Sequence, residues 1–427
     1  MDIKIYPSKL NGSITVPPSK SMAHRLIICA SLADGISKIR NVELSDDISA
    51  TIDAMKVAGA DIEIDGNTVK VKGRANKDVS ELREKPDIKE IPRKTSDINL
   101  VDCNESGSTL RFLIPVFSAL ELKARFIGEG RLHTRPLKPY YDIFDSQKIT
   151  YSYDEEKMDL RVEGNLSPGK IYIRGDISSQ FISGLLFSLP LLDGDSEIEI
   201  TTKLESRSYV DMTIEALKRF GVDIDIDYPK IFIKGNQRYI STEVKVEGDY
   251  SQAAFFMSAR ALGSDIEVSG LNEDSLQGDK IVAEVFESLI TETYNTVDVS
   301  QLPDVVPEIA FVASLSSGMT KIVNASRLRL KESDRLAAIY MELGKLGADV
   351  QIDEDSLVIR GVNKLRGGVE VWSHDDHRIA MMLAIASAFC EEPVVLKSAE
   401  SVKKSYPKFY EDFKKLGGIF HEWNLGK

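Results

Sequence analysis

Several kinds of residue are scarce in this chain, and each shortage excludes a class of protein. The 427 residues include only 3 cysteines and 2 tryptophans. Cys29, Cys103 and Cys390 lie far apart without C-x-x-C spacing, which excludes a disulfide framework and a typical zinc site and favours reduced thiols in a cytosolic protein. No apolar run reaches the roughly 20 residues that span a membrane. The first residues lack the apolar core of a signal peptide, so we expect a cytoplasmic protein.

Positive charge is also in deficit, because the formal net charge is −13. Proteins that bind nucleic acids or acidic membranes usually present a basic face, so neither partner is expected. Hydrophobic residues make up 42% and charged residues 28%, an ordinary mixture for a globular protein of two or more domains. An anionic ligand would therefore need cations that are concentrated locally in a cleft.

A degenerate internal repeat organises the chain. Each copy has a glycine, two strand-like segments of mostly alternating polarity and a polar turn, which is the pattern of a β-hairpin. The clear copies are 59–73, 221–235 and 347–361, a weaker one is 149–164, and amphipathic helices are expected before the clear copies at 48–57, 210–220 and 336–346. The glycine of each clear copy lies where a helix C-terminus needs a left-handed residue. The sequence thus predicts an α/β chain of repeated helix–glycine–hairpin units, with a polar surface excursion at 77–97.

The stretch 17–25 combines a strand end, a helix start and several cations. Two prolines end the strand, and Ser19 or Ser21 is expected to cap the helix that follows. Lys20, Ser21 and Arg25 then lie near the helix N-terminus, where amide N–H groups and the helix dipole favour an anion. A capped helix with solvated basic residues is the plain alternative.

Five further segments have unusual compositions: 104–111, 128–136, 176–181, 331–335 and 374–378. The first has hydroxyl residues around Gly107, where an anion could approach the backbone. In the second, a glycine-flanked segment expected to be a mobile loop, Arg131 and Arg135 suit bidentate anion contacts. Ser178, Ser179 and Gln180 offer directional hydrogen bonds in the third. Taken alone, a capped helix start explains the first segment equally well, a solvated loop explains the second equally well, and a helix cap at Ser178 or Ser179 explains the third better.

The last two segments carry acidic and basic groups together. On a helix, Lys331 and Arg335 would share one face, with Glu332 beside them as a candidate for proton transfer. The alternative is a charged helix surface. His374, Asp375, Asp376 and His377 form a possible metal cluster before an apolar helix at 379–389, but the adjacent Arg378 disfavours a cation and no metal is expected.

Taken in order, these segments resemble the 5-enolpyruvylshikimate-3-phosphate synthase family, the enolpyruvyl transferases of the shikimate pathway. The matching motifs are 18–21, 107–112, 131–136, 178–181, 331–336 and 375–381, and the resemblance covers essentially the whole chain. It implies two similar domains, each of three βαβαββ units around a pseudo-threefold axis as an inside-out α/β barrel, with the active site in the cleft between them. It places residues 1–18 and 239–427 in one domain and 19–238 in the other.

The resemblance also implies the reaction. The 5-hydroxyl of shikimate 3-phosphate adds to phosphoenolpyruvate, and the tetrahedral intermediate then loses phosphate, a step towards chorismate and the aromatic amino acids. No cofactor is expected, the inhibitor glyphosate is expected to occupy the phosphoenolpyruvate site, and the protein is expected to be a monomer.

Site residues follow by matching position. The residues expected to meet shikimate 3-phosphate are Lys20, Ser21, Arg25, Ser178, Ser179, Gln180, Ser206, Asp304 and Lys331. Those expected to meet phosphoenolpyruvate are Lys20, Gly107, Arg135, Gln180, Arg335, Arg378 and Lys404, where the neighbouring Lys403 leaves the register open. Asp304, Glu332 and Lys20 are the expected proton-transfer residues.

Two departures and two rivals accompany the resemblance. Arg327 stands where some members have an asparagine against the shikimate phosphate, and Glu105 stands where others have an asparagine. One rival is a UDP-N-acetylglucosamine enolpyruvyl transferase, but its loop normally carries a reactive cysteine, and 128–139 here has none. The other rival is a non-catalytic anion-binding scaffold, which would not need Asp304 and Glu332 beside the cations.

Overall fold

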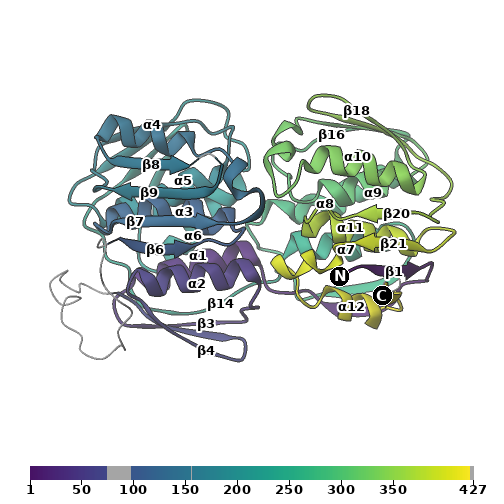
Figure 1. The fold of residues 1–427 in the computed structure, drawn as a ribbon, viewed down its shortest axis with the longest axis horizontal. Coiled ribbons are helices and arrows are strands. Elements are labelled where there is room, and N and C mark those ends of the chain that lie inside the picture. The colour runs from purple at the N-terminus through teal and green to yellow at the C-terminus, as the bar shows by residue number, and fades with distance from the viewer. Residues whose placement is uncertain (75–97, 155, 424–427) are drawn as a thin grey trace. The chain divides into compact units, whose positions relative to one another are not determined.

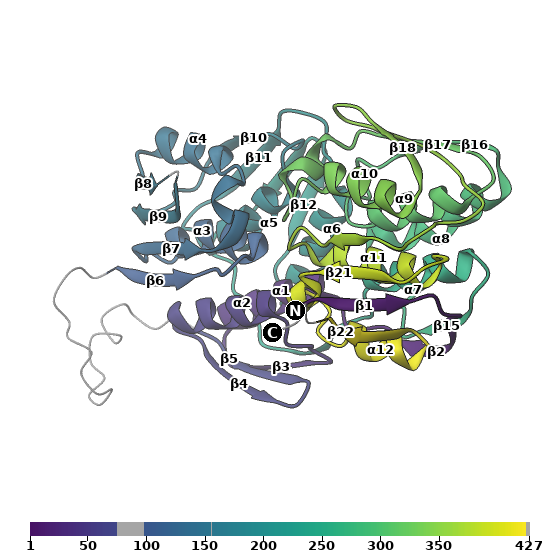
Figure 2. The ribbon, with the colours of Figure 1, turned by 45° about the vertical axis from the view of Figure 1, so that its right-hand side comes forward.

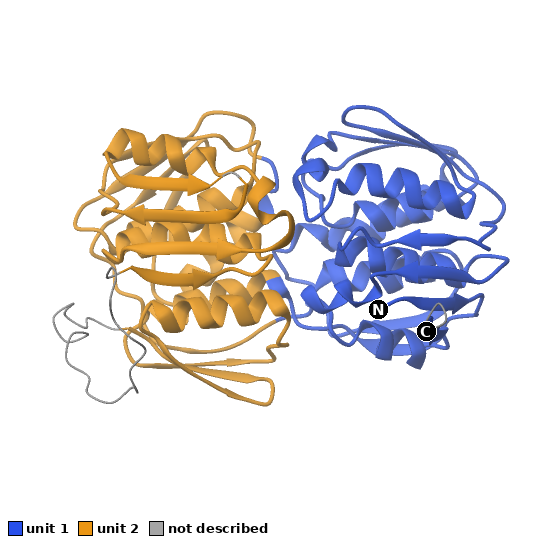
Figure 3. Cartoon of the chain, in the orientation of Figure 1, with its two compact units in different colours: residues 1–20, 205–208, 247–427 blue, residues 21–204, 209–246 orange. Residues whose placement is uncertain are grey.

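The computed structural model describes residues 1–74, 98–154 and 156–423. The segment 77–97, predicted to be a surface excursion, lies outside the described residues. Contacts divide the chain into unit 1, residues 1–20, 205–208 and 247–427, and unit 2, residues 21–204 and 209–246 (Figure 3). The short segment 205–208 belongs to unit 1 although unit 2 flanks it on both sides. The domain boundaries stated above, at residues 18/19 and 238/239, stay a prediction.

One sheet topology recurs in both units of the described chain. In each four-stranded sheet the first two strands are parallel, and the next two join them antiparallel, as a hairpin in every such sheet but β20-β21-β1-β22. In unit 2 the sheets are β14 (Glu243–Lys245), β3 (Ile36–Arg40), β5 (Thr68–Lys72) and β4 (Asp61–Asp65); β6 (Asn99–Asp102), β7 (Ala124–Gly128), β9 (Met158–Glu163) and β8 (Thr150–Asp154); and β10 (Lys170–Ile173), β11 (Ser196–Ile200), β13 (Lys230–Ile233) and β12 (Ile224–Asp227).

Unit 1 repeats this plan with one smaller sheet. Its sheets are β16 (Tyr294–Asp298), β17 (Met319–Val323), β19 (Leu357–Arg360) and β18 (Asp349–Ile352); β20 (Glu370–Trp372), β21 (Val394–Lys397), β1 (Ile3–Tyr6) and β22 (Ile419–Glu422); and the pair β15 (Asp265–Ser269) and β2 (Asn11–Thr15). The N-terminal strand β1 lies between β21 and β22, so that Ile3 pairs with both Leu396 and Glu422 (Figure 2). The first residues of the chain thereby complete a sheet whose other strands come from its end.

The helices are of two kinds (Figure 1). Those that are buried on nearly all sides are α1 (Lys20–Leu32), α3 (Gly107–Ala119), α5 (Ser179–Ser188), α7 (Tyr250–Ala261), α9 (Val306–Leu315) and α11 (His377–Ala388). Those with an exposed face are α2 (Asp46–Val57), α4 (Lys138–Gln147), α6 (Arg207–Arg219), α8 (Val282–Thr291), α10 (Arg335–Leu346) and α12 (Phe409–Lys415). A helix that is apolar all round must lie inside the fold, whereas an amphipathic one covers its outside.

Short 3-10 helices fill several connections. They are η2 (Gly130–Thr134), η3 (Leu189–Leu191), η4 (Gly278–Ile281), η5 (Ser326–Leu330) and η6 (Ala399–Lys404). The segment 128–136, which was expected to be a loop, contains η2.

The predicted repeat is confirmed. The expected helices correspond to α2, α6 and α10, and the hairpins after them to β4–β5, β12–β13 and β18–β19. Gly59, Gly221 and Gly347 end the helices with φ angles of 105°, 77° and 104°, a conformation that favours glycine. The fold is therefore the expected mixed α/β arrangement of repeated units. Within the described ranges, no helix is both long enough and apolar enough to cross a membrane.

Candidate functional site

The starts of the buried helices carry several of the predicted site residues. In unit 2, Ser106 Oγ accepts the N–H of Thr109 at 3.1 Å at the start of α3, and Ser178 Oγ accepts the N–H of Gln180 at 3.3 Å at the start of α5. In unit 1, the Asp376 carboxylate caps α11 by accepting the N–H of Arg378 at 2.9 Å. These serines and Asp376 each satisfy one helix N–H, and the positive end of each dipole remains beside the motif residues.

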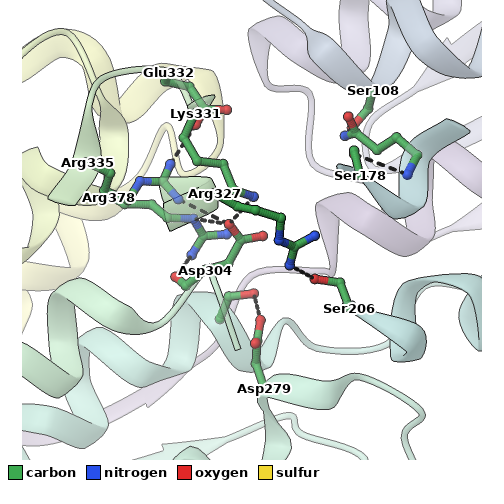
Figure 4. Close-up of polar contacts among 12 residues, drawn as sticks. Ser108, Ser178, Ser206, Asp279, Asp304, Arg327, Lys331, Glu332, Arg335 and Arg378 are labelled. Carbon is green, nitrogen blue, oxygen red and sulfur yellow. Dashed lines mark hydrogen bonds and ion pairs between the residues drawn. The ribbon is translucent and has the colours of Figure 1, made fainter. Parts of the chain in front are cut away.

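Six side chains of unit 1 form a charge-balanced group, which we call the Asp304 cluster. Its members are Asp304, Lys331, Glu332, Arg335, Asp376 and Arg378, and Figure 4 labels all of them except Asp376. Asp304 Oδ1 accepts bonds from Lys331 Nζ at 3.2 Å and from Arg335 Nη1 at 3.1 Å. Arg378 donates from Nη1 to the backbone oxygen of Asp304 at 2.6 Å. Three cations and three carboxylates therefore form one connected network of ion pairs.

Arg335 is the centre of this cluster. Its side chain is only 1% exposed, and its guanidinium also bonds Asp376 at 2.9 Å and Glu332 at 2.6 Å. A buried cation with three carboxylate partners is held in a fixed geometry, because loss of one partner would leave buried charge uncompensated. In this structure Arg335 is the counter-ion that aligns Asp304 and Glu332.

One expectation about this cluster is wrong. Lys331 and Arg335 do not share a helix face, because α10 begins at Arg335 and Lys331 ends the preceding 3-10 helix η5 in an extended conformation. Asp334 caps α10 by accepting the N–H of Ala337 at 3.0 Å, which starts the helix four residues after Lys331. The two cations meet through Asp304 instead.

The cluster shifts the pKa values of its members. Burial alone would raise the pKa of Asp304, but the charges of Arg378, Lys331 and Arg335 outweigh burial and hold that pKa well below its ordinary value. Burial lowers the pKa of Lys331, although the Asp304 carboxylate opposes this shift. Asp304 is therefore an anion over the whole physiological range, while Lys331 releases its proton more readily than an exposed lysine.

Lys20, His377 and Lys404 also belong to this part of unit 1. The backbone N–H of Lys20 donates to Asp249 Oδ2 at 3.1 Å. Burial, and then the positive charge of Lys20, lower the pKa of His377 well below its ordinary value, so its imidazole is neutral. Lys404 Nζ donates to the backbone oxygen of Asp375 at 2.6 Å, which places Lys404 rather than its neighbour Lys403 beside the start of α11.

Unit 2 holds a second polar group around Gln180. Arg111 Nη1 donates to Gln180 Oε1 at 2.8 Å, and Gln180 Nε2 donates to Ser108 Oγ at 2.9 Å. This arrangement fixes which end of the Gln180 amide is the donor. A Cβ added to Gly107 would lie 2.3 Å from Arg135 Nη1, so the Arg135 guanidinium lies directly against the glycine at the start of α3.

Arg25 has a more internal place than the motif indicates, while Ser21 is only partly buried. Arg25 Nε donates to Thr213 Oγ1 at 2.8 Å, Nη1 to the Ser21 backbone oxygen at 2.6 Å and Nη2 to the Tyr209 backbone oxygen at 2.8 Å. Burial lowers the pKa of Arg25 to about 10. These bonds tie α1 to α6, and contact of Arg25 with a substrate stays a prediction. Ser179, also predicted, is the buried first residue of α5.

The remaining predicted residue, Ser206, lies in unit 1. Its hydroxyl oxygen accepts a bond from Arg327 Nη2 at 2.7 Å, and its backbone has a left-handed φ of 53°. Within the part of the chain that the structure describes, no group of three His, Cys, Asp or Glu side chains is arranged to hold a metal ion.

Sequence reasoning missed several residues that support the site. Asp376 was noted as a possible metal ligand and as part of a motif, and Arg111 only as part of a motif. Asp249, Asp279 and Glu308 were not noticed. Asp249 caps α7 as well as accepting the Lys20 N–H. Burial, and then the Asp304 charge, raise the pKa of Asp279 to about 6, while burial raises that of Glu308 to about 8. A carboxylate at the start of an apolar helix is a signal that could have revealed Asp249 and Glu308, whereas Asp279 lies in η4 and has no such signal.

Comparison with known proteins gives this geometry its family. The model of the EPSP synthase (3-phosphoshikimate 1-carboxyvinyltransferase) family matches residues 5–413. A 3-phosphoshikimate 1-carboxyvinyltransferase of Clostridioides difficile (strain 630) is 53% identical, with 100% of this chain and 99% of that protein covered. One from Clostridium botulinum (strain Alaska E43 / Type E3) is 52% identical, with 99% of each chain covered.

Solved structures agree at the level of the fold. An EPSP synthase from Acinetobacter baumannii superimposes with a TM-score of 0.77 at 22% identity, covering 99% of this chain and 100% of the other. The enolpyruvyl transferase NikO from Streptomyces tendae gives a TM-score of 0.76 at 16% identity, covering 98% of each chain. From the family match over nearly its whole length and from relatives at about half identity, the chain belongs to the EPSP synthase (3-phosphoshikimate 1-carboxyvinyltransferase) family.

Proposed function

We propose that this protein transfers the enolpyruvyl group of phosphoenolpyruvate to the 5-hydroxyl of shikimate 3-phosphate and releases phosphate. Family membership supports the reaction, and the Asp304 cluster is the observation that carries it to this chain's own residues. The reaction needs a carboxylate that is kept ionised beside cations for phosphate and carboxylate groups. Asp304, with Lys331, Arg335 and Arg378 around it, meets that need.

The residues assigned to each substrate are those that the family resemblance implies. Shikimate 3-phosphate is assigned to Lys20, Ser21, Arg25, Ser178, Ser179, Gln180, Ser206, Asp304 and Lys331. Phosphoenolpyruvate is assigned to Lys20, Gly107, Arg135, Gln180, Arg335, Arg378 and Lys404. The assignment of Arg135 gains support from its contact with Gly107, and that of Lys404 from its bond beside the start of α11.

The proton transfers then follow from the charges. Asp304 takes the proton of the 5-hydroxyl as that oxygen attacks C2 of phosphoenolpyruvate, and Glu332, which must first take up a proton from solvent, donates it to C3. In the second step C3 returns its proton and the C2–phosphate bond breaks, with Lys20 as a further proton carrier. The low pKa of Asp304 belongs to the protein without substrates. Bound phosphate and carboxylate groups compete for the same cations, which raises the pKa of Asp304 toward that of a useful base.

Three accompanying properties are also proposed. The protein acts as a monomer in the cytoplasm, and glyphosate competes with phosphoenolpyruvate. The reaction needs no metal or redox cofactor, because both steps move only protons and the phosphate leaving group. Millimolar glyphosate should raise the apparent KM for phosphoenolpyruvate, and the absence of any inhibition would contradict its placement at that site.

Glu332→Gln tests whether the cluster is catalytic. The amide oxygen of glutamine can still accept the bond from Arg335 Nη2, so folding and substrate binding should persist. Loss of the transferable proton should lower kcat by a factor of about 100 or more. Phosphate release measures kcat, and calorimetry measures binding of shikimate 3-phosphate. Asp349→Asn, in an exposed ion pair with Arg360, is the matched control. Unchanged turnover in Glu332→Gln would favour a binding protein.

A further inference from the structure

The segment 205–208 is held in unit 1 by bonds to the loop after β16. The backbone N–H of Ser206 donates to the Ser300 oxygen at 3.1 Å, and that of Arg207 donates to Gln301 Oε1 at 2.8 Å. Ser206 has a φ of 53°, a conformation that costs a non-glycine residue free energy and persists only where its surroundings fix it. Something must therefore hold this turn in place.

Arg327 does so with a single guanidinium. Its Nε forms an ion pair with the Glu205 carboxylate, and its Nη2 donates to Ser206 Oγ at 2.7 Å and to the Ser300 oxygen at 3.1 Å. The Arg327 and Glu205 side chains are only 12% and 18% exposed. The planar fork of arginine can reach these three acceptors at once, whereas the single ammonium of lysine cannot do so in the same geometry.

The bond from Arg327 also decides where the Ser206 hydroxyl points. A serine hydroxyl has one donor and accepts through its lone pairs, so a hydroxyl that accepts from Arg327 must direct its own hydrogen elsewhere. Arg327 further acts on Lys331, since its charge is one of the influences that lower the Lys331 pKa. The Ser206 hydroxyl thus directs its own donor hydrogen away from the Arg327 guanidinium (Figure 4).

We infer that Arg327, held by Glu205, is a positioning residue for the acceptor substrate, and that it acts by aiming the Ser206 hydroxyl at the acceptor's phosphate. The inference rests on the proposed function. It gives a role to the arginine that stands where some members of the family have an asparagine. Discrimination between acceptors with and without a phosphate group should therefore depend on Arg327.

Arg327→Gln and Ser206→Ala, singly and together, test this role. Each single change should weaken binding of shikimate 3-phosphate by about tenfold, as expected for one charge-assisted hydrogen bond. The KM for phosphoenolpyruvate should stay within about twofold, because that substrate has other partners. Binding of shikimate, which lacks the phosphate, should not change. Arg327→Lys should bind shikimate 3-phosphate about as weakly as Arg327→Gln does. It serves as the second variant if Arg327→Gln does not fold. Arg360→Gln, at an exposed ion pair, is the control.

The double variant separates action through Ser206 from direct contact. If Arg327 acts through Ser206, the double variant should bind shikimate 3-phosphate no more weakly than either single variant. Losses that multiply would overturn the inference, as would equal losses for shikimate and its phosphate, or wild-type affinity in Arg327→Gln. Wild-type protein that releases no phosphate with the two substrates would instead overturn the proposed function, and the inference with it.

Discussion

At Gly107, adding a single methyl group should weaken binding of phosphoenolpyruvate without disturbing the fold. In Gly107→Ala the new Cβ would meet Arg135 Nη1, the end of a flexible side chain, so the guanidinium would move while the backbone stays. Displacing one charge-assisted contact should raise the KM for phosphoenolpyruvate by about tenfold. Steady-state kinetics measures this change. Gly344→Ala, in helix α10 where a Cβ meets nothing within 4 Å, is the control and should leave KM unaltered. Equal KM values for Gly107→Ala and wild type would contradict the contact.

Glu308 is a residue whose ionisation should appear in the pH dependence of stability. It is fully buried, neither carboxyl oxygen has a hydrogen-bond partner among the described residues, and burial raises its pKa to about 8. The unfolded chain loses this proton at the ordinary pKa of about 4.3, so the folded state binds more protons between these values. The contribution of Glu308 to stability is therefore greatest at low pH and decreases by about 1.4 kcal/mol per pH unit as pH rises towards 8.

Glu308→Gln removes this titration. The free energy of unfolding of the variant, relative to wild type, should increase steadily from about pH 5 to about pH 8. Denaturant unfolding at a series of pH values measures it, and Glu391→Gln, at an exposed pair with Lys364, should show no such trend. Parallel curves for Glu308→Gln and wild type would show that the carboxyl is ionised in the folded protein.

At the scale of elements, Lys20 at the start of α1 has a structural bond through its backbone and a proposed function through its side chain. Asp249 accepts the N–H of Lys20 with one carboxylate oxygen and the N–H of Gln252, in α7, with the other. The bond to α1 uses the backbone of Lys20, which alanine keeps. Lys20→Ala should therefore lower kcat by about 100-fold or more while hardly changing Tm.

Asp249→Ala, unlike Lys20→Ala, should lower the stability of the protein. It removes a cap from α7 and the partner of the α1 N–H, which should cost about 1–2 kcal/mol of stability. Thermal unfolding of wild type, Lys20→Ala and Asp249→Ala measures the Tm of each protein. If Lys20→Ala unfolds instead, the lysine is a structural helix-start residue and its assignment to the site fails.

Local pattern explains which elements could be predicted. The hairpins and their preceding helices were found because alternation, helical spacing and a left-handed glycine all act within about 20 residues. Lys331 was wrongly placed on the same helix face as Arg335, because only the Asp334 cap shows that α10 begins at Arg335. Partners distant in sequence were also missed. Nothing near Lys20 indicates Asp249, and nothing near Arg335 indicates Asp376.

At the scale of the whole molecule, the chain's order hides its connections. Strand β1 completes a sheet with β21 and β22, and residues 205–208 join a unit that does not flank them. Pairing over such distances leaves no local signature, because each strand shows only its own alternation. The family resemblance predicted that the N-terminal strand joins the C-terminal part of the chain. Nothing in the sequence predicted that residues 205–208 belong to unit 1.

The most direct test of the account is a phosphate-release assay with phosphoenolpyruvate and two acceptors, supplied separately. Shikimate 3-phosphate should give one phosphate per enolpyruvyl group transferred, and UDP-N-acetylglucosamine should give none above background. Release with UDP-N-acetylglucosamine alone, or with neither acceptor, would contradict the proposed function.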